Sequence, residues 1–92
     1  MTRNQCLATL KVIGFKPHPH IVRAYAAKKT DYIVIISTKR LSIDYIPTPS
    51  TETSFNELRA KMQRPIKTNF QQGIHALIRL MINEEKQKDT KL

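Results

Sequence analysis

Two histidines, His18 and His20, have the spacing in this sequence that most directly suggests chemistry. In an extended segment, residues two apart point to the same side, where both rings could share a metal ion. Neither a Cys-x-x-Cys pair nor a His-Glu-x-x-His motif accompanies them to complete a ligand set. The pattern therefore favours a proline- and histidine-rich surface loop, with imidazoles that could donate to phosphate, over a metal site.

The residues for nucleophilic catalysis are also incomplete, because a nucleophile needs a base and a group that orients the base. The one cysteine, Cys6, falls on the apolar side of an expected helix, which is typical of a core residue. Asp31 is explained as a turn residue, and Asp44 has no acidic partner beside it. We expect no enzyme, no metal and no cofactor. A metal-free ribonuclease that uses His20 and nearby lysines is the one enzymatic alternative.

Charge is the strongest signal in the composition. The 92 residues include 16 Lys and Arg against 7 Asp and Glu, which gives a formal net charge of +9. Residues 1–40 contain eight of the basic residues and one acid, and residues 58–83 contain five basic residues and no acid. Such asymmetry is typical of a protein with one surface that faces a polyanion. We therefore expect nucleic acid or a ribonucleoprotein as the partner.

The candidate contacts are the cations at expected turns and those around Pro65. One pair precedes the apolar run 32–36 and another pair follows it, so the two pairs should lie at opposite ends of a sheet. The three tyrosines would stack on bases if they were exposed, although their apolar strands favour core packing. The predicted binding residues are Arg23, Lys28, Lys29, Lys39, Arg40, Arg59, Lys61, Arg64 and Lys67.

Three strands and the first of three helices would position the sheet cations. Apolar residues at helical spacing predict a helix over about 3–13, which Gly14 ends. Strands are expected over 21–26, 32–37 and 41–45, with a hairpin turn at 28–31. The middle strand is apolar on both faces and is expected to be central. Together these segments predict an antiparallel meander.

Two more helices follow a proline-containing loop at 47–51. Ser54 and Glu57 match a capping box for a helix with Phe55 on its apolar stripe, which ends before Pro65. The last helix should begin near Thr68 or Asn69, and Gly73 inside it costs up to ~1 kcal/mol relative to Ala. The expected fold is α+β, a three-stranded antiparallel meander with helices packed on one face, in the order α-β-β-β-α-α. A single domain would cover 1–86, followed by a frayed polar tail at 87–92.

The order of helix, three antiparallel strands and helix resembles double-stranded RNA-binding domains and the hic-type toxin ribonucleases that share their fold. The segment LKVIGF looks like the end of the first helix in those proteins. The segment KTNFQQG departs from the lysine-rich helix start of the double-stranded RNA-binding family, since it offers only Lys67. The segment HPHIV has neither the Gly nor the Ser of the Gly-Ser-His strand motif in the hic-type toxins.

In length, single α+β domain and lack of a catalytic motif, the chain also resembles the small anti-CRISPR inhibitors that phages and mobile elements encode. That resemblance implies a stoichiometric blocker of a CRISPR surveillance complex that contacts Cas proteins and guide RNA or the DNA-binding channel, in the cytoplasm of the host. No apolar run approaches the ~20 residues of a membrane span, so we expect no membrane as partner. Since we expect no enzyme, we also expect no small-molecule substrate. The alternatives are a free RNA- or DNA-binding protein with a dsRNA-binding-like fold, and a hic-type toxin ribonuclease.

Overall fold

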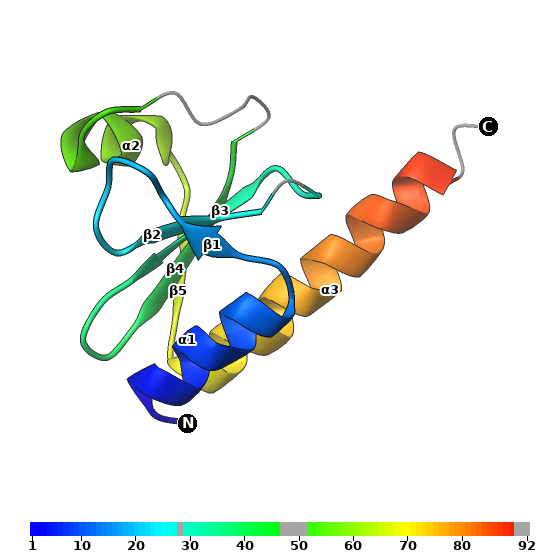
Figure 1. Ribbon diagram of the computed structural model, residues 1–92. Helices are drawn as coiled ribbons and strands as arrows, with labels where there is room; N and C mark the ends of the chain where they lie inside the picture. The colour runs from blue at the N-terminus through cyan, green and yellow to red at the C-terminus, as the bar shows by residue number, and fades with distance from the viewer. Residues whose placement is uncertain (28, 47–51, 90–92) are drawn as a thin grey trace.

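A computed structural model describes residues 1–27, 29–46 and 52–89, with 87–89 described by their backbone alone. Five strands form one antiparallel sheet in the spatial order β1-β2-β3-β4-β5, and three helices pack around it (Figure 1). The elements along the chain are α1 (Arg3–Val12), β1 (Lys16–Pro17), β2 (Ala24–Ala26), β3 (Tyr32–Ile36), β4 (Leu41–Tyr45), α2 (Phe55–Lys61), β5 (Ile66–Thr68) and α3 (Phe70–Asp89). The α+β class is confirmed.

Helix α1 begins and ends at residues whose side chains and backbone satisfy its terminal groups. Thr2 and Gln5 form a capping box, in which each side chain accepts from the backbone N–H of the other. At the other end Gly14 has φ +102, and its N–H donates to Lys11 while the Phe15 N–H donates to Leu10. This is the Schellman arrangement, and it confirms the prediction that Gly14 ends the helix.

The sheet buries both of its faces, and the alternation along β3 separates two cores. Val34 and Ile36 belong to one cluster with Cys6 and Leu10 of α1 and with Leu77 of α3. The intervening residue Ile33 belongs to a second cluster, which also contains Ile21, Ala24, Ile46, Leu58 and Met62. The prediction that the apolar run 32–36 is a central strand is confirmed.

The prediction that all helices pack on one face is wrong. Helices α1 and α3 cover one face, whereas α2 lies on the other side of the sheet (Figure 1). Leu58 and Met62 point from α2 into the second cluster beside Ile33. Because β3 is apolar on both faces, it needs cover on each, and α2 supplies the second layer.

The meander has five strands rather than three. The additional strands are short: β1 has two residues and β5 has three, and each is an edge strand. Strand β2 is also shorter than the predicted strand 21–26, since it begins at Ala24 and residues 22 and 23 form a turn. The predicted loop at 47–51 lies outside the described residues. Helix α3 runs to Asp89, past the predicted domain end at residue 86.

One proline stands at an outward-facing position in edge strand β1, and another directly precedes edge strand β5. His18 donates to Ala24 and Lys16 pairs with Ala26, so the backbone of Pro17 faces away from β2. On the other edge, the Ile46 N–H donates to the Asp31 carbonyl, which fixes the residues of β4 whose backbone bonds to β3. The alternate residues of β4 bond to β5, in a register that turns the backbone of Lys67 outward. Pro65 lies two residues before Lys67 and faces the same way. Proline has no N–H to donate, so both edges are poor templates for an added strand.

Within the described residues, no helix is long and apolar enough to cross a membrane.

Candidate nucleic-acid interface

The turn between β3 and β4 holds two of the predicted cations in an ordered, exposed position. Ser37 N–H donates to the Arg40 carbonyl at 2.9 Å, and Arg40 N–H donates to Ser37 Oγ at 3.1 Å. Ile36 and Leu41 pair directly below this closure. Lys39 and Arg40 are both exposed. The serine side chain therefore fixes the turn while the two cations stay free to contact a partner.

Arg23 lies at the same end of the sheet, in a turn that precedes β2. Ile36 N–H donates to the Arg23 carbonyl at 2.9 Å, which places Arg23 next to the end of β3. Its φ is +78, the only positive φ among the non-glycine residues described. We call the group Arg23, Lys39 and Arg40 the basic end of the sheet.

Helices α1 and α3 both begin at the basic end. Thr68 pairs with Leu41, so α3 starts beside the β3–β4 turn. Helix α1 contacts α3, and in Figure 1 the two helices start towards the same end of the molecule. Neither helix has an acidic residue in its first turn. Helix N-termini carry partial positive charge, which adds to the positive potential of the three cations. The basic end therefore combines side-chain and backbone charge of the same sign.

The opposite end of the sheet, at the β2–β3 turn, carries both signs of charge. Lys29 is exposed there, but Asp31 lies two residues away and Glu84 of α3 accepts from Thr30 Oγ1 at 2.8 Å. Burial, and then the negative charge of Glu84, raise the pKa of Tyr32 above its ordinary value. We call this the mixed end. The prediction that the two turns lie at opposite ends is confirmed, and the predicted cation Lys28 lies outside the described residues.

Beside the mixed end, α1, β1 and the β2–β3 turn surround a hollow of about 730 Å³. Its walls are mostly aliphatic, and its charged lining residues are Lys16, Lys29 and Asp31. This composition does not match a polyanion, because a carboxylate in the same lining weakens the field of the two cations. This hollow thus lies apart from the basic end of the sheet.

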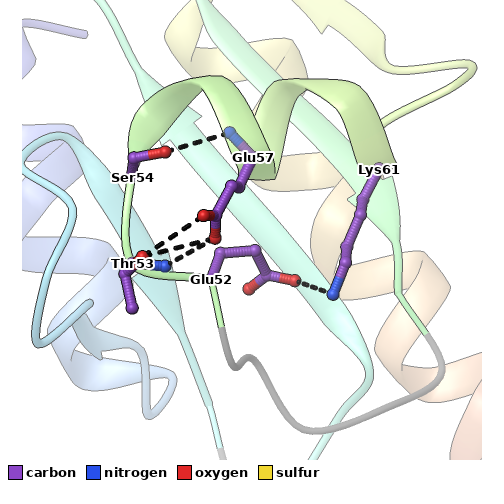
Figure 2. Close-up of polar contacts among 5 residues, drawn as sticks. All are labelled: Glu52, Thr53, Ser54, Glu57 and Lys61. Carbon is purple, nitrogen blue, oxygen red and sulfur yellow. Dashed lines mark hydrogen bonds and ion pairs between the residues drawn. The ribbon is translucent and has the colours of Figure 1, made fainter.

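Among the cations around Pro65, Lys61 differs from the others because it forms an ion pair that the sequence did not suggest. Lys61 Nζ lies 2.9 Å from Glu52 Oε1, and Glu52 is only 1% exposed (Figure 2). In the same view Glu57 accepts from the N–H of Thr53 at 3.0 Å while Ser54 caps α2. Glu52, the acid that pairs with Lys61, therefore lies outside the acid-free stretch 58–83. Lys61 is therefore engaged within the protein, whereas Arg59, Arg64 and Lys67 are exposed.

Phe55, which the sequence assigned to an apolar stripe, is an aromatic residue that lines the same hollow as Arg23 of the basic end. Phe55 is the first residue of α2 and is 40% exposed, while Leu58 and Met62 alone reach the core from that helix. Tyr32 and Tyr45 form an edge-to-face pair at the mixed end, with ring centroids 5.3 Å apart. Tyr25 packs against the main core. The exposed aromatic residue near Arg23 is therefore Phe55, although helical periodicity predicted that Phe55 would be buried.

The His18 and His20 rings form an edge-to-face contact, with centroids 6.2 Å apart, but neither Cys6 nor His75 joins them in a group of three possible ligands. His18 is buried and its Nδ1 accepts from His20 N–H at 3.1 Å, whereas the His20 side chain is exposed. Burial raises the pKa of the Cys6 thiol, and Arg3 lowers it by a smaller amount, so the thiol stays protonated at neutral pH. His75 is exposed on α3. Among the residues described, no three His, Cys, Asp or Glu are grouped to hold a metal ion.

Comparison with known proteins places no relative beside this chain. No protein family, no curated protein and no solved structure matches it at a significant level.

Proposed function

We propose that this chain is a non-enzymatic binding protein that contacts nucleic acid through the basic end of its sheet. The observation that supports this is the separation of charge along the sheet. Arg23, Lys39 and Arg40 lie at the end where α1 and α3 begin, and the first turns of both helices lack acids. Phosphate groups are the ligand that such a surface attracts, because each Lys or Arg releases a condensed counterion when it neutralises a phosphate.

We further propose that the chain works on a nucleoprotein complex, as a stoichiometric inhibitor of the anti-CRISPR type. Among the described residues, one end of the sheet is basic and the other carries both signs of charge, so a nucleic acid bound at the basic end would leave the mixed end and its aliphatic hollow for protein contacts. The edge prolines Pro17 and Pro65 direct such contacts away from strand addition. A Cas protein bound to guide RNA would offer both kinds of surface together.

The direct test is the salt dependence of binding to a fluorescent single strand and to a duplex. Each phosphate contact contributes about −0.7 (single strand) or about −0.9 (duplex) to the slope of log K against log salt. Three contacts at the basic end therefore predict a slope near −2 for the single strand. A slope near zero for both ligands would reject the proposal.

The inhibitor setting is tested by titration against a guide-loaded surveillance complex. Inhibition should be complete at a fixed ratio of protein to complex, and the protein should leave excess RNA intact. Cleavage of RNA in large excess that disappears in His20→Ala would instead support the ribonuclease alternative.

A further inference from the structure

The turn that carries Arg23 adopts a conformation that normally requires glycine. Ala24 N–H donates to the Ile21 carbonyl at 3.4 Å, so Ile21–Ala24 is a β-turn with Val22 and Arg23 at its centre. A positive φ at the second central position is the type II pattern, in which Gly or Asn is favoured. An arginine there costs about 1–2 kcal/mol. Strain of this kind is found where the side chain serves a function.

The strained turn projects its central residues into solvent beside α2. Val22 is 86% exposed, and the nearby ring of Phe55 is 40% exposed. With His20, Ile21 and Arg23 they line a hollow of about 320 Å³. The turn is anchored by the bond from Ile36 to the Arg23 carbonyl, and Phe55 is anchored by the Ser54 cap. Two exposed apolar side chains and a cation thus surround one hollow on a preformed surface.

Phe55 and Arg23 are residue types that bind unpaired nucleotides. Aromatic rings stack on bases of any sequence, and cations in the same groove follow the backbone. A base inside a duplex is already stacked and paired, so only a single strand can place a base in such a hollow without first opening the helix. The neighbouring cations Lys39 and Arg40 would lie along the path of the same strand.

We propose that this hollow receives a base of single-stranded nucleic acid, with Phe55 against the base and Arg23 against the adjacent phosphate. This inference rests on the proposed function, and it adds the substrate class: an unpaired strand rather than a duplex. His20 is exposed at the rim and can hydrogen-bond the edge of the base.

The test measures binding of the full chain to a labelled single strand of about 12 nucleotides, as oligo-dT and as oligo-U, and to a duplex of equal length. The variants are Phe55→Leu, which keeps an apolar side chain and removes the ring, and Val22→Ser. Tyr45→Leu is the matched control, because Tyr45 is a 48% exposed aromatic residue at the mixed end. Phe55→Leu should weaken binding to the single strand by about 5- to 150-fold, with duplex binding changed less than twofold. Tyr45→Leu should leave both unchanged.

Arg23→Gly provides a second measurement, because glycine removes the cation and relieves the strain of the turn. Single-strand binding should fall while the melting temperature does not. A Phe55→Leu variant that binds the single strand like the wild type, or loses single strand and duplex equally, overturns the base-binding inference.

The proposed function is judged separately, by Lys39→Glu combined with Arg40→Glu. If that variant loses binding while Phe55→Leu does not, the basic end contacts phosphates but no base binds in the hollow. The proposed function then stands and the base-binding inference is wrong. If neither variant changes binding to any nucleic acid, both proposals are wrong.

Discussion

The two ends of the sheet are built from similar sequence but differ in electrostatics. Each turn carries a pair of adjacent cations, at 28–29 and at 39–40. Around Lys39 and Arg40 the fold gathers another cation and the starts of two helices. Around Lys29 it gathers Asp31, Glu84 and a tyrosine pair. Helices α1 and α3 run from the basic end towards the mixed end, so the partial positive charge of their N-termini adds at one end, while the carboxylates of Asp31 and Glu84 lower the potential at the other.

The comparison shows that a count of charges along the sequence is an incomplete guide to a binding surface. A Lys-Lys pair and a Lys-Arg pair have the same formal charge, but the field at each depends on which termini and acids the fold brings nearby. Among the predicted cations that the structure describes, Arg23, Lys39 and Arg40 are exposed at the end of the sheet where two helices without acids in their first turns begin, whereas Lys61 pairs with Glu52. Four predictions test the contrast between the two ends.

The largest effect is expected from reversing charge at one end and then at the other. Lys39→Glu with Arg40→Glu should weaken binding to nucleic acid by at least about 100-fold, because two phosphate contacts are replaced by repulsion. Lys16→Glu with Lys29→Glu makes the same change in net charge at the mixed end and should weaken binding less than about fivefold through the long-range field alone. The measurement is fluorescence anisotropy at fixed salt. Equal losses in both variants would mean that net charge, not its placement, drives binding.

The second prediction concerns how α3 is held at the basic end, where it lies close to β4. A Cβ added to Gly73 would lie 3.0 Å from Leu41 Cβ, 2.7 Å from Leu41 Cδ2 and 2.5 Å from Thr68 Oγ1. Gly73→Ala should therefore destabilise the protein by about 1–3 kcal/mol, despite the better helix propensity of alanine. Gln72→Ala, one residue away and exposed, should stay within about 0.5 kcal/mol of the wild type. Urea unfolding followed by circular dichroism measures both.

At the mixed end the same helix also makes a polar contact with the β2–β3 turn. Thr30 Oγ1 donates to Glu84 Oε2 and also accepts from Tyr32 N–H at 3.4 Å. Thr30→Val keeps the shape of the side chain and removes the hydroxyl, and it should cost about 1 kcal/mol of unfolding free energy. Thr30→Ser keeps the hydroxyl and should recover part of that loss. If valine were as stable as threonine, the contact with Glu84 would contribute nothing to anchoring α3.

The long elements of the fold were predictable from the sequence because their signals are local. The alternation of β4, the apolar run of β3, the helical stripes and the Gly14 stop each act within a few residues. Strands β1 and β5 were missed because two or three residues contain no period. They become strands only through pairing with β2 and β4.

The site was only partly predictable, because its decisive features depend on tertiary neighbours. The sequence located Lys39 and Arg40 in an exposed turn, but it gave no sign that Glu52 would approach Lys61. Phe55 matched the apolar spacing of α2, yet a residue at the first position of a helix lies at the edge of the packed face and remains open to solvent. The positive φ of Arg23 had no local signal, since glycine or asparagine is expected there.

The smallest of the four effects is expected from His18, which follows β1 and lines the hollow beside the mixed end. Burial lowers the pKa of His18 below its ordinary value of 6.5; the charge of Glu52 opposes this shift, and His20 adds to it. The folded protein therefore holds fewer protons on this residue than the unfolded chain does. Its contribution to stability is complete above about pH 6.5 and declines as the pH falls through that value towards the folded pKa. Unfolding free energies measured between about pH 7.5 and 5.5 should show this decline, and His18→Gln should reduce it, whereas His75→Gln on the exposed side of α3 should not. An unchanged decline in His18→Gln would show that His18 is not the source of the acid sensitivity.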